Sequence, residues 1–283
     1  MKTIKKIVAV VLCLIITLSC FAIQSSAKEE KLNYLVIGDS IAEGFGVTNR
    51  DECAFGKIVA DTNGYNYRNL AHMGYDSEDI YNFLTTRETY IDSVEWADII
   101  TLSVGGNNFL LDNAPLLVFS GLVGYYAPFD ERAERFNKYF ELSIEEIHRL
   151  NPDAVVLVQT LYNTWTSFAY DIFQAAADRI NNEIYSYLEK NPGSYYIVDT
   201  VESFYKNPSL ISSDTVHPNT AGNIVLARLT LEKLNEIGLG EATEPVLLVE
   251  GIDRDYIIEY FPFPIGHILT FLANLATGNM FHK

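Results

Sequence analysis

The chain has 283 residues, 48% of them hydrophobic, and a formal net charge of −17 at pH 7. This length and composition allow one sizeable domain with a continuous core. The acidic excess disfavours nucleic acids and anionic membrane surfaces as partners. It favours a neutral or cationic substrate, although solubility alone also explains it.

The N-terminus has the pattern of a secretory signal peptide. Three lysines among the first six residues precede an apolar run over residues 7–23. Small residues, Ser25 and Ala27, then occupy the two positions that a signal peptidase recognises. We therefore expect residues 1–27 to be a signal peptide cleaved after Ala27, and the protein to be secreted.

Two alternatives keep the protein attached to a membrane. An uncleaved anchor needs an apolar run of about 18 or more residues, and residues 7–23 fall just short and include polar side chains. Lipidation at Cys20 is the second alternative, because Leu18-Ser19-Cys20 resembles a lipoprotein cleavage site. Thr17, however, stands where such sites have leucine.

Cleavage after Ala27 changes both the charge and the cysteine content. It removes three lysines and no acidic residue, so the net charge falls from −17 to −20. Cys53 is then the single cysteine, which excludes an internal disulfide and leaves little material for a cysteine-based site. The histidines show no paired spacing typical of metal ligands. We expect no metal site.

Short apolar runs predict five strands, the first of them buried. They cover residues 34–37, 67–71, 97–104, 154–158 and 195–199. Apolar periodicity and helix-breaking residues predict helices over residues 54–60, 77–85, 131–150, 171–189 and 218–236. Strands that alternate with helices indicate an α/β fold with a parallel sheet covered on both faces.

Three candidate loops follow the first three predicted strands. Ser40 comes after the first strand, Gly74 after the second and Asn107 after the third. The carboxyl ends of parallel strands lie at one edge of a sheet, where such folds build their ligand sites. We therefore expect these three residues to lie close together.

Two segments fall outside this alternation. Residues 110–130 form an apolar insertion directly after Asn107, and residues 241–283 form a C-terminal extension. The extension includes an amphipathic helical pattern over residues 265–276 that is too short to span a bilayer. We expect the extension to pack on a single domain over residues 28–240, with peripheral membrane or partner contact as the alternative.

Ser40, Asp214 and His217 have the chemistry of a serine nucleophile and its base. A serine hydroxyl becomes nucleophilic only with a base within hydrogen-bond reach. Histidine, with an unperturbed pKa of about 6.5, exchanges protons near neutrality. Asp214, three residues before His217, can fix the imidazole tautomer. Each motif alone is also explained by a turn or a helix start, whereas the combination favours catalysis.

Acyl transfer also needs hydrogen-bond donors directed at the oxygen that becomes negative. Gly74 offers a backbone N–H with no side chain in the way, and Asn107 offers a side-chain amide. Loop geometry also explains both residues, and for Gly74 alone it is the better explanation. With the serine and histidine motifs, they complete the set of groups that ester hydrolysis requires.

Together these motifs resemble the GDSL/SGNH hydrolase family, which comprises lipases and esterases, over about residues 32–235. The matching blocks are G-D-S at Ser40, N-L-A-x-x-G-x-x-S-x-D through Gly74, G-x-N at Asn107, and D-x-x-H from Asp214 to His217. The resemblance implies a three-layer α/β/α fold of flavodoxin-like type with a five-stranded parallel sheet. It also implies ester hydrolysis through an acyl-enzyme without a metal or organic cofactor.

The resemblance assigns roles to the same residues. Ser40 is the expected nucleophile, Asp214 and His217 complete a catalytic triad, and the Ser40 N–H, Gly74 and Asn107 form the oxyanion hole. Asn108 departs from the family pattern, because many members have aspartate there, which puts an orienting role of this side chain in question.

We expect an exported esterase or lipase-like acyl hydrolase whose substrate is a small-molecule, lipid or acylated-carbohydrate ester. The apolar insertion favours a fatty acyl chain, although it can equally pack as core. Deacetylation of a polysaccharide is the alternative within the enzyme class, with Tyr162 and Trp165 as platforms for sugar rings. A non-catalytic surface-binding protein on a hydrolase scaffold is the alternative outside it.

Overall fold

The computed structural model describes residues 31–247 apart from positions 48, 112–113, 164 and 166–169. The predicted signal peptide, the Cys20 alternative and most of the C-terminal extension lie outside the described residues. A compact unit begins at Leu32.

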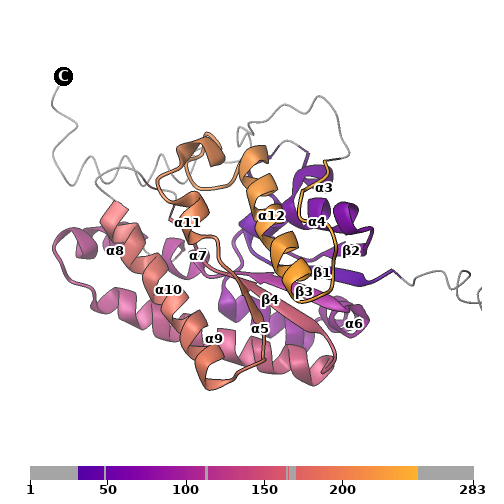
Figure 1. Cartoon of the computed structure of the whole chain (residues 1–283). Helices are drawn as coiled ribbons and strands as arrows, with labels where there is room; N and C mark the ends of the chain where they lie inside the picture. The colour runs from indigo at the N-terminus through magenta and orange to yellow at the C-terminus, as the bar shows by residue number, and fades with distance from the viewer. Residues whose placement is uncertain (1–30, 48, 112–113, 164, 166–169, 248–283) are drawn as a thin grey trace, which may run out of the picture. The chain divides into compact units, whose positions relative to one another are not determined.

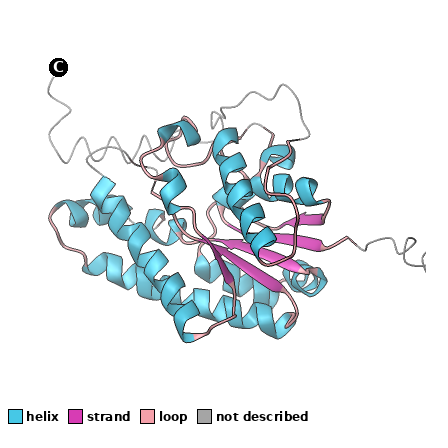
Figure 2. Cartoon of the chain, viewed as in Figure 1, coloured by secondary structure: helices cyan, strands magenta, loops and turns pink. Residues whose placement is uncertain are grey.

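A five-stranded sheet, with the strand order β2-β1-β3-β4-β5, runs through this unit (Figures 1 and 2). All four strand pairs are parallel. The strands are β1 (Asn33–Gly38), β2 (Asn66–Asn69), β3 (Ile99–Ser103), β4 (Val155–Gln159) and β5 (Tyr196–Val198). This arrangement confirms the parallel α/β sheet that the sequence predicts.

Helices connect the strands and cover the sheet. The described ones are α2 (Ser40–Glu43), α3 (Arg50–Cys53), α4 (Phe55–Asn63), α5 (Ser77–Thr86), α6 (Glu88–Trp96), α7 (Gly106–Leu110), α8 (Ala114–Leu122), α9 (Ala127–Leu150), α10 (Tyr170–Lys190), α11 (Val201–Phe204), the 3₁₀ helix η1 (Pro208–Leu210) and α12 (Thr220–Glu236). Among them, none combines the length and the apolar character needed to cross a membrane.

Side chains alternate between the two faces of β1, and each face meets its own helices. Leu35 and Ile37 belong to a buried cluster with residues of α5, α6, α9 and α10. Tyr34 and Val36 belong to a second cluster with residues of α4 and α12. Two apolar clusters, one on each face of the sheet, make the three-layer α/β/α architecture that the sequence predicts.

Besides short helices of three to five residues, the sequence prediction lacks two helices of nine residues each, α6 and α8. The sequence predicts nothing regular over α6, where Tyr90 and Val94 are the buried apolar residues of a short polar segment. It predicts only an apolar insertion where α8 forms, because α8 is apolar on all sides and so lacks the periodicity of a surface helix. In α8, Leu117 is buried in the core while Phe119 is exposed.

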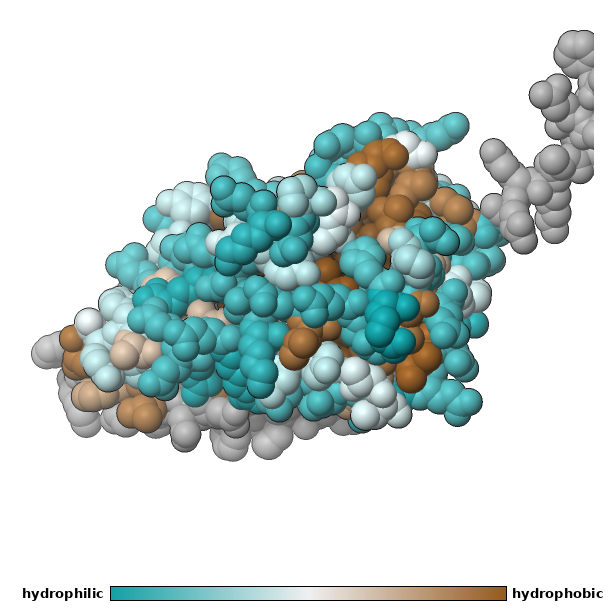
Figure 3. Space-filling model, turned by 90° about the horizontal axis from the view of Figure 1, so that it is seen from below, coloured by the Kyte–Doolittle hydropathy of each residue, from teal (hydrophilic) through white to brown (hydrophobic). Residues whose placement is uncertain are grey.

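The surface reflects the acidic, polar composition. The face seen in Figure 3 is mostly hydrophilic, with apolar residues gathered in separate small patches. The first residues of the C-terminal extension follow α12, and there the Val246 N–H donates to Thr62 Oγ1 at 2.9 Å. Leu247 packs against the α4–α12 cluster. The prediction that the remaining extension packs on the domain stays a prediction.

Candidate active site

Ser40 is the first residue of α2, directly after β1. Asp39 caps this helix, since its Oδ1 accepts the Ile41 N–H at 2.9 Å. Gly38 has a φ of +157°, and a Cβ there would lie 2.1 Å from the Ser103 carbonyl oxygen on β3. Only glycine allows this close approach of the two strand ends. The turn presents the Ser40 side chain at the carboxyl edge of the sheet.

Asp214 and His217 lie in one tight loop between η1 and α12. The Ser212 N–H donates to the His217 carbonyl at 2.8 Å, which closes the loop. Asp214 Oδ1 accepts the N–H groups of Val216 at 2.8 Å and His217 at 2.9 Å. One carboxylate oxygen thus organises the backbone, and the other oxygen is left for the imidazole.

The His217 ring bridges Asp214 and Ser40. Its Nδ1 lies 2.6 Å from Asp214 Oδ2, and its Nε2 lies 2.8 Å from Ser40 Oγ. A carboxylate only accepts, so the proton belongs on Nδ1, and Nε2 is free to accept the serine hydroxyl. All three residues are buried. This is the geometry of a nucleophile, a base and an orienting carboxylate.

The charge state of Asp214 suits this role. Burial acts to raise the pKa of Asp214, but the hydrogen bond and charge of His217 and the two backbone N–H groups outweigh it. The pKa of Asp214 is therefore held below its ordinary value. The carboxylate stays ionised across the neutral range and can stabilise a protonated imidazole.

Gly74 and Asn107 line the same small cavity as Ser40 and His217, a space of about 50 Å³. Asn107 Nδ2 donates one hydrogen to the Tyr75 carbonyl at 2.8 Å, and an amide nitrogen has a second hydrogen to give. Gly74 has a φ of +86°, a conformation that favours glycine. The structure thus brings together all five residues that the sequence singles out.

Asn108 ties the Asn107 loop to the start of α5. Its Oδ1 accepts the Ser77 N–H at 3.3 Å, and its Nδ2 donates to Ser77 Oγ at 3.0 Å. Arg132 on α9 donates to the carbonyls of Asn108 and Leu111, at 2.9 and 3.0 Å. Asn108 therefore has an orienting role that uses an amide donor, which a carboxylate at this position would lack.

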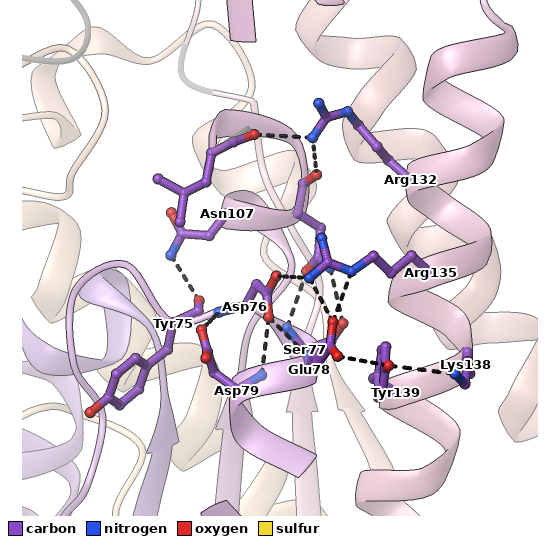
Figure 4. Close-up of polar contacts among 12 residues, drawn as sticks. Tyr75, Asp76, Ser77, Glu78, Asp79, Asn107, Arg132, Arg135, Lys138 and Tyr139 are labelled. Atoms are coloured by element: carbon purple, nitrogen blue, oxygen red, sulfur yellow. Dashed lines mark hydrogen bonds and ion pairs between the residues drawn. The ribbon is translucent and has the colours of Figure 1, made fainter. Parts of the chain in front are cut away.

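The first turn of α5 is held from the other side by α9 (Figure 4). Asp76 caps α5 and forms a capping box with Asp79. Arg135 lies 3.2 Å from Asp76 and 2.7 Å from Glu78. Tyr139 donates to Glu78 at 2.8 Å. These contacts fix the chain segment that directly follows Gly74. Among their residues, only Asp79 belongs to a motif of the sequence, as the last position of the N-L-A-x-x-G-x-x-S-x-D block.

Two further buried polar groups surround the triad. Burial, opposed by the Ile41 N–H and the charge of His217, raises the pKa of Asp39 to about 6. Burial and then the carboxylates of Asp39 and Asp214 raise the pKa of Tyr162. The Tyr162 hydroxyl has no hydrogen-bond partner among the described residues. The sequence gives no signal for either environment, because burial depends on the packing of distant segments.

An apolar cavity of about 70 Å³ adjoins the Ser40 cavity. The two cavities share the residues Ile41, Gly106, Leu110 and Val216. Trp165 and Phe173 form part of the apolar wall and stack with ring centroids 4.5 Å apart. A third, smaller cavity continues under Leu117 and Val118 of α8. The apolar insertion therefore packs in the core and also borders the space that leads away from Ser40.

Other histidine and cysteine side chains of the described residues lie away from the Ser40 cavity. His148 Nε2 donates to the Ser194 carbonyl at 2.6 Å, and Cys53 is a free, buried thiol. His267 and His282 lie outside the described residues. Within the described part of the chain, no three His, Cys, Asp or Glu side chains are grouped so as to hold a metal ion.

Known proteins resemble this chain in sequence or in fold. The uncharacterized protein YpmR of Bacillus subtilis (strain 168) is 24% identical over 222 residues, 75% of this chain and 84% of the relative. The lipase Lip_vut3 from a goat rumen metagenome aligns with a TM-score of 0.61 and 22% identity, covering 75% of this chain and 99% of the lipase. Phospholipase A1 from Streptomyces albidoflavus NA297 aligns with a TM-score of 0.56 and 17% identity, covering 72% and 99%.

A family model decides the classification. The model of the GDSL-like Lipase/Acylhydrolase family matches residues 36–224, which is 189 of the 283 residues. The match includes Ser40, Gly74, Asn107, Asp214 and His217. The chain therefore belongs to the GDSL-like lipase/acylhydrolase family and is a carboxylic ester hydrolase of that type.

Proposed function

We propose that the protein hydrolyses carboxylic esters through an acyl-enzyme on Ser40. The observation that carries this proposal is the unbroken hydrogen-bonded series Asp214–His217–Ser40, with spacings of 2.6 and 2.8 Å. A hydroxyl that is hydrogen-bonded to an oriented imidazole is an activated nucleophile.

The reaction has two balanced halves. Ser40 Oγ attacks the ester carbonyl carbon while His217 Nε2 takes the hydroxyl proton. The tetrahedral intermediate collapses, the bond from carbon to the alcohol oxygen breaks, and His217 returns the proton to the departing alcohol. Water then attacks the acyl-enzyme with the same proton transfers, which releases the acid and restores Ser40.

The oxyanion of each intermediate needs donors in the Ser40 cavity. The N–H groups of Ser40 and Gly74 and the second amide hydrogen of Asn107 are the candidates. The bond from Asn107 to the Tyr75 carbonyl fixes the amide before the reaction. Donors that are already oriented stabilise the transition state without reorganisation, and a single donor contributes about two to three orders of magnitude in kcat.

We assign the apolar cavity beside Ser40 to the acyl group. Its walls are almost entirely hydrocarbon, so it excludes a sugar or a charged alcohol and accepts methylene groups. A lipase and a phospholipase A1, by their names, stand among the proteins that this chain resembles in fold. An ester of a linear acyl chain is the substrate class that this cavity fits.

Polysaccharide deacetylation remains the second candidate function, but the structure does not support the expected sugar platforms. Tyr162 and Trp165, expected as sugar platforms, are only 6% and 8% exposed. Tyr162 stacks on Phe204 with ring centroids 4.0 Å apart. Rings that face core neighbours cannot offer a face to a polymer chain in solvent.

A chain-length series of p-nitrophenyl esters tests the proposal on the purified protein beside Ser40→Ala. We expect turnover that rises from acetate to longer acyl chains and is absent in Ser40→Ala. Turnover of acetate alone would favour the acetyl esterase. No turnover, with no fluorophosphonate adduct on Ser40, would favour the non-catalytic scaffold.

We also propose that the protein is exported, with residues 1–27 removed. The support is the sequence pattern alone. Cell fractionation and N-terminal sequencing of the mature protein test it, with Lys28 expected as the first residue. A mature N-terminus at Cys20 that carries lipid would replace secretion with anchoring.

The C-terminal extension has its own test. Deleting the residues after Gly240 and measuring solubility and binding to zwitterionic vesicles separates two roles. Loss of solubility supports packing on the domain, and loss of vesicle binding with unchanged solubility supports peripheral membrane contact.

A further inference from the structure

Glu43 links the helix of the nucleophile to the loop of Gly74. It is the last residue of α2, three positions after Ser40. Its Oε2 accepts the Met73 N–H at 2.6 Å. Met73 and Gly74 are consecutive, and both line the Ser40 cavity. The peptide just before the Gly74 N–H is therefore held by a carboxylate from the nucleophile's own helix.

Arg50 holds the other oxygen of this carboxylate. Its Nη1 lies 2.6 Å from Glu43 Oε1, and the two side chains are 29% and 18% exposed. The Arg50 guanidinium also lies over the Phe45 ring, 4.4 Å from its centroid. Phe45 in turn packs edge-on against the His217 ring at 5.0 Å. Glu43 is thus held by Arg50, and Arg50 is linked to the base only through the Phe45 ring.

The two ends of the Gly74 loop are held by different means. After Gly74, the α5 capping box and Asn108 fix Asp76 and Ser77. Before Gly74, Glu43 supplies the side-chain contact to the Met73 N–H. At Gly74 itself, a Cβ would meet nothing within 4 Å, so packing does not confine the loop there. A backbone turn closes around Gly74, since the Tyr75 N–H donates to the His72 carbonyl at 3.3 Å. The position of the Gly74 N–H thus depends on this turn and on the contacts that hold its two ends.

We propose that Glu43, held by Arg50, is a positioning residue that sets the Gly74 N–H in the oxyanion site. This inference rests on the proposed function, because it assigns Glu43 to the same reaction. Oxyanion donors act only when they point at the developing charge. Glu43 touches neither the substrate nor the reacting atoms, and acts through the Met73 peptide.

The test compares Glu43→Ala and Glu43→Gln with the wild type on a p-nitrophenyl ester and its thiono analogue. We expect Glu43→Ala to lower kcat for the oxo ester roughly 10- to 100-fold with KM little changed, as for a misplaced catalytic group. The thiono ester should lose much less, because sulfur is a weak hydrogen-bond acceptor and gains little from the donors. Glu43→Gln keeps an acceptor for Met73 and should recover most of the rate.

Glu146→Ala is the matched control. Glu146 is a carboxylate paired to Arg149 at 2.6 Å on α9, and its side chain is 13% exposed. Its removal should leave kcat and the oxo-to-thiono rate ratio unchanged. A Glu43→Ala enzyme with wild-type kcat, or one that loses both esters equally, overturns the positioning role. Wild-type turnover and labelling of Ser40 on the same preparation test the proposed function separately.

Discussion

His217 Nε2 lies 2.8 Å from Ser40 Oγ, although 177 positions separate the two residues in the chain. The parallel sheet makes this contact, because β1 delivers Ser40 to its carboxyl edge and the loop before α12 delivers His217 to the same edge. The contact joins the first and last motifs of the chain. The catalytic roles of both residues stay a prediction, and the following experiments test them.

Asp214→Asn isolates the orienting carboxylate. The amide keeps an Oδ1 acceptor for the Val216 and His217 N–H groups, so the loop should persist. It places a donor opposite Nδ1, which moves the imidazole proton to Nε2 and removes the base from Ser40. We expect kcat to fall by roughly three to four orders of magnitude. Asp171→Asn, an exposed change of equal charge on α10, should keep full activity; a similar loss there would mean that charge alone is responsible.

Asn107→Ala removes the proposed side-chain oxyanion donor. We expect kcat to fall by about two to three orders of magnitude while KM changes little, because the donor acts mainly in the transition state. The control is Asn151→Ala, which removes an amide that bonds the carbonyls of Val94 and Ala97 away from the site. Steady-state kinetics with one ester compare the two. Full activity of Asn107→Ala would exclude the assignment.

Asp39→Asn tests the buried carboxyl of the first motif. The folded pKa of about 6 lies above the ordinary value of 3.8, so the folded protein holds this proton more tightly than the unfolded chain. The resulting stability is complete below pH 3.8 and is lost as the pH rises through about 6. Asparagine keeps the cap acceptor without the charge. Above that range the variant should be more stable than the wild type by roughly 1–3 kcal/mol.

Urea denaturation at pH 4 and pH 8 measures this difference. The gain of Asp39→Asn should be present at pH 8 and close to zero at pH 4. An equal gain at both values would show that the carboxyl does not titrate between them. Asp171→Asn again serves as the surface control.

Ala176→Leu tests the acyl assignment of the apolar cavity. Ala176 lies on α10 and lines both the 70 Å³ cavity and its continuation under α8. A larger side chain there should reduce kcat/KM for a long-chain ester by about tenfold or more and spare the acetate, since each excluded methylene is worth about 1–3 kcal/mol. Ala133→Leu, in the same core on α9, is the control for overpacking. An unchanged chain-length profile would place the acyl group elsewhere.

The sequence predicts the fold well where local pattern and packing agree. β3 is fully buried, and β1 and β4 are buried apart from their first residues, so the hydrophobicity of these strands marks them directly. β2 is a short polar edge strand with exposed and half-buried residues, so the run over residues 67–71 marks it less directly. The sequence does not predict α6, because it has few apolar residues, or α8, because it has no polar face.

Some residues of the site can be predicted from the sequence, and others only from the folded structure. The residue types of Ser40, Asp214 and His217, and the spacing of the last two, are enough to predict from the sequence that they form one catalytic set. Glu43 and Asp39 cannot be predicted in this way, because their roles depend on the Met73 N–H and on burial, which only the folded chain supplies.

Covalent labelling tests the central claim most directly. The wild-type protein and Ser40→Ala are treated with a fluorophosphonate, digested and examined by mass spectrometry beside their ester turnover. We expect one adduct, on the peptide with Ser40, and a loss of turnover of roughly four to six orders of magnitude in Ser40→Ala. An active wild type labelled at another residue, or a Ser40→Ala variant that keeps its turnover, would contradict the assignment of Ser40 as the nucleophile.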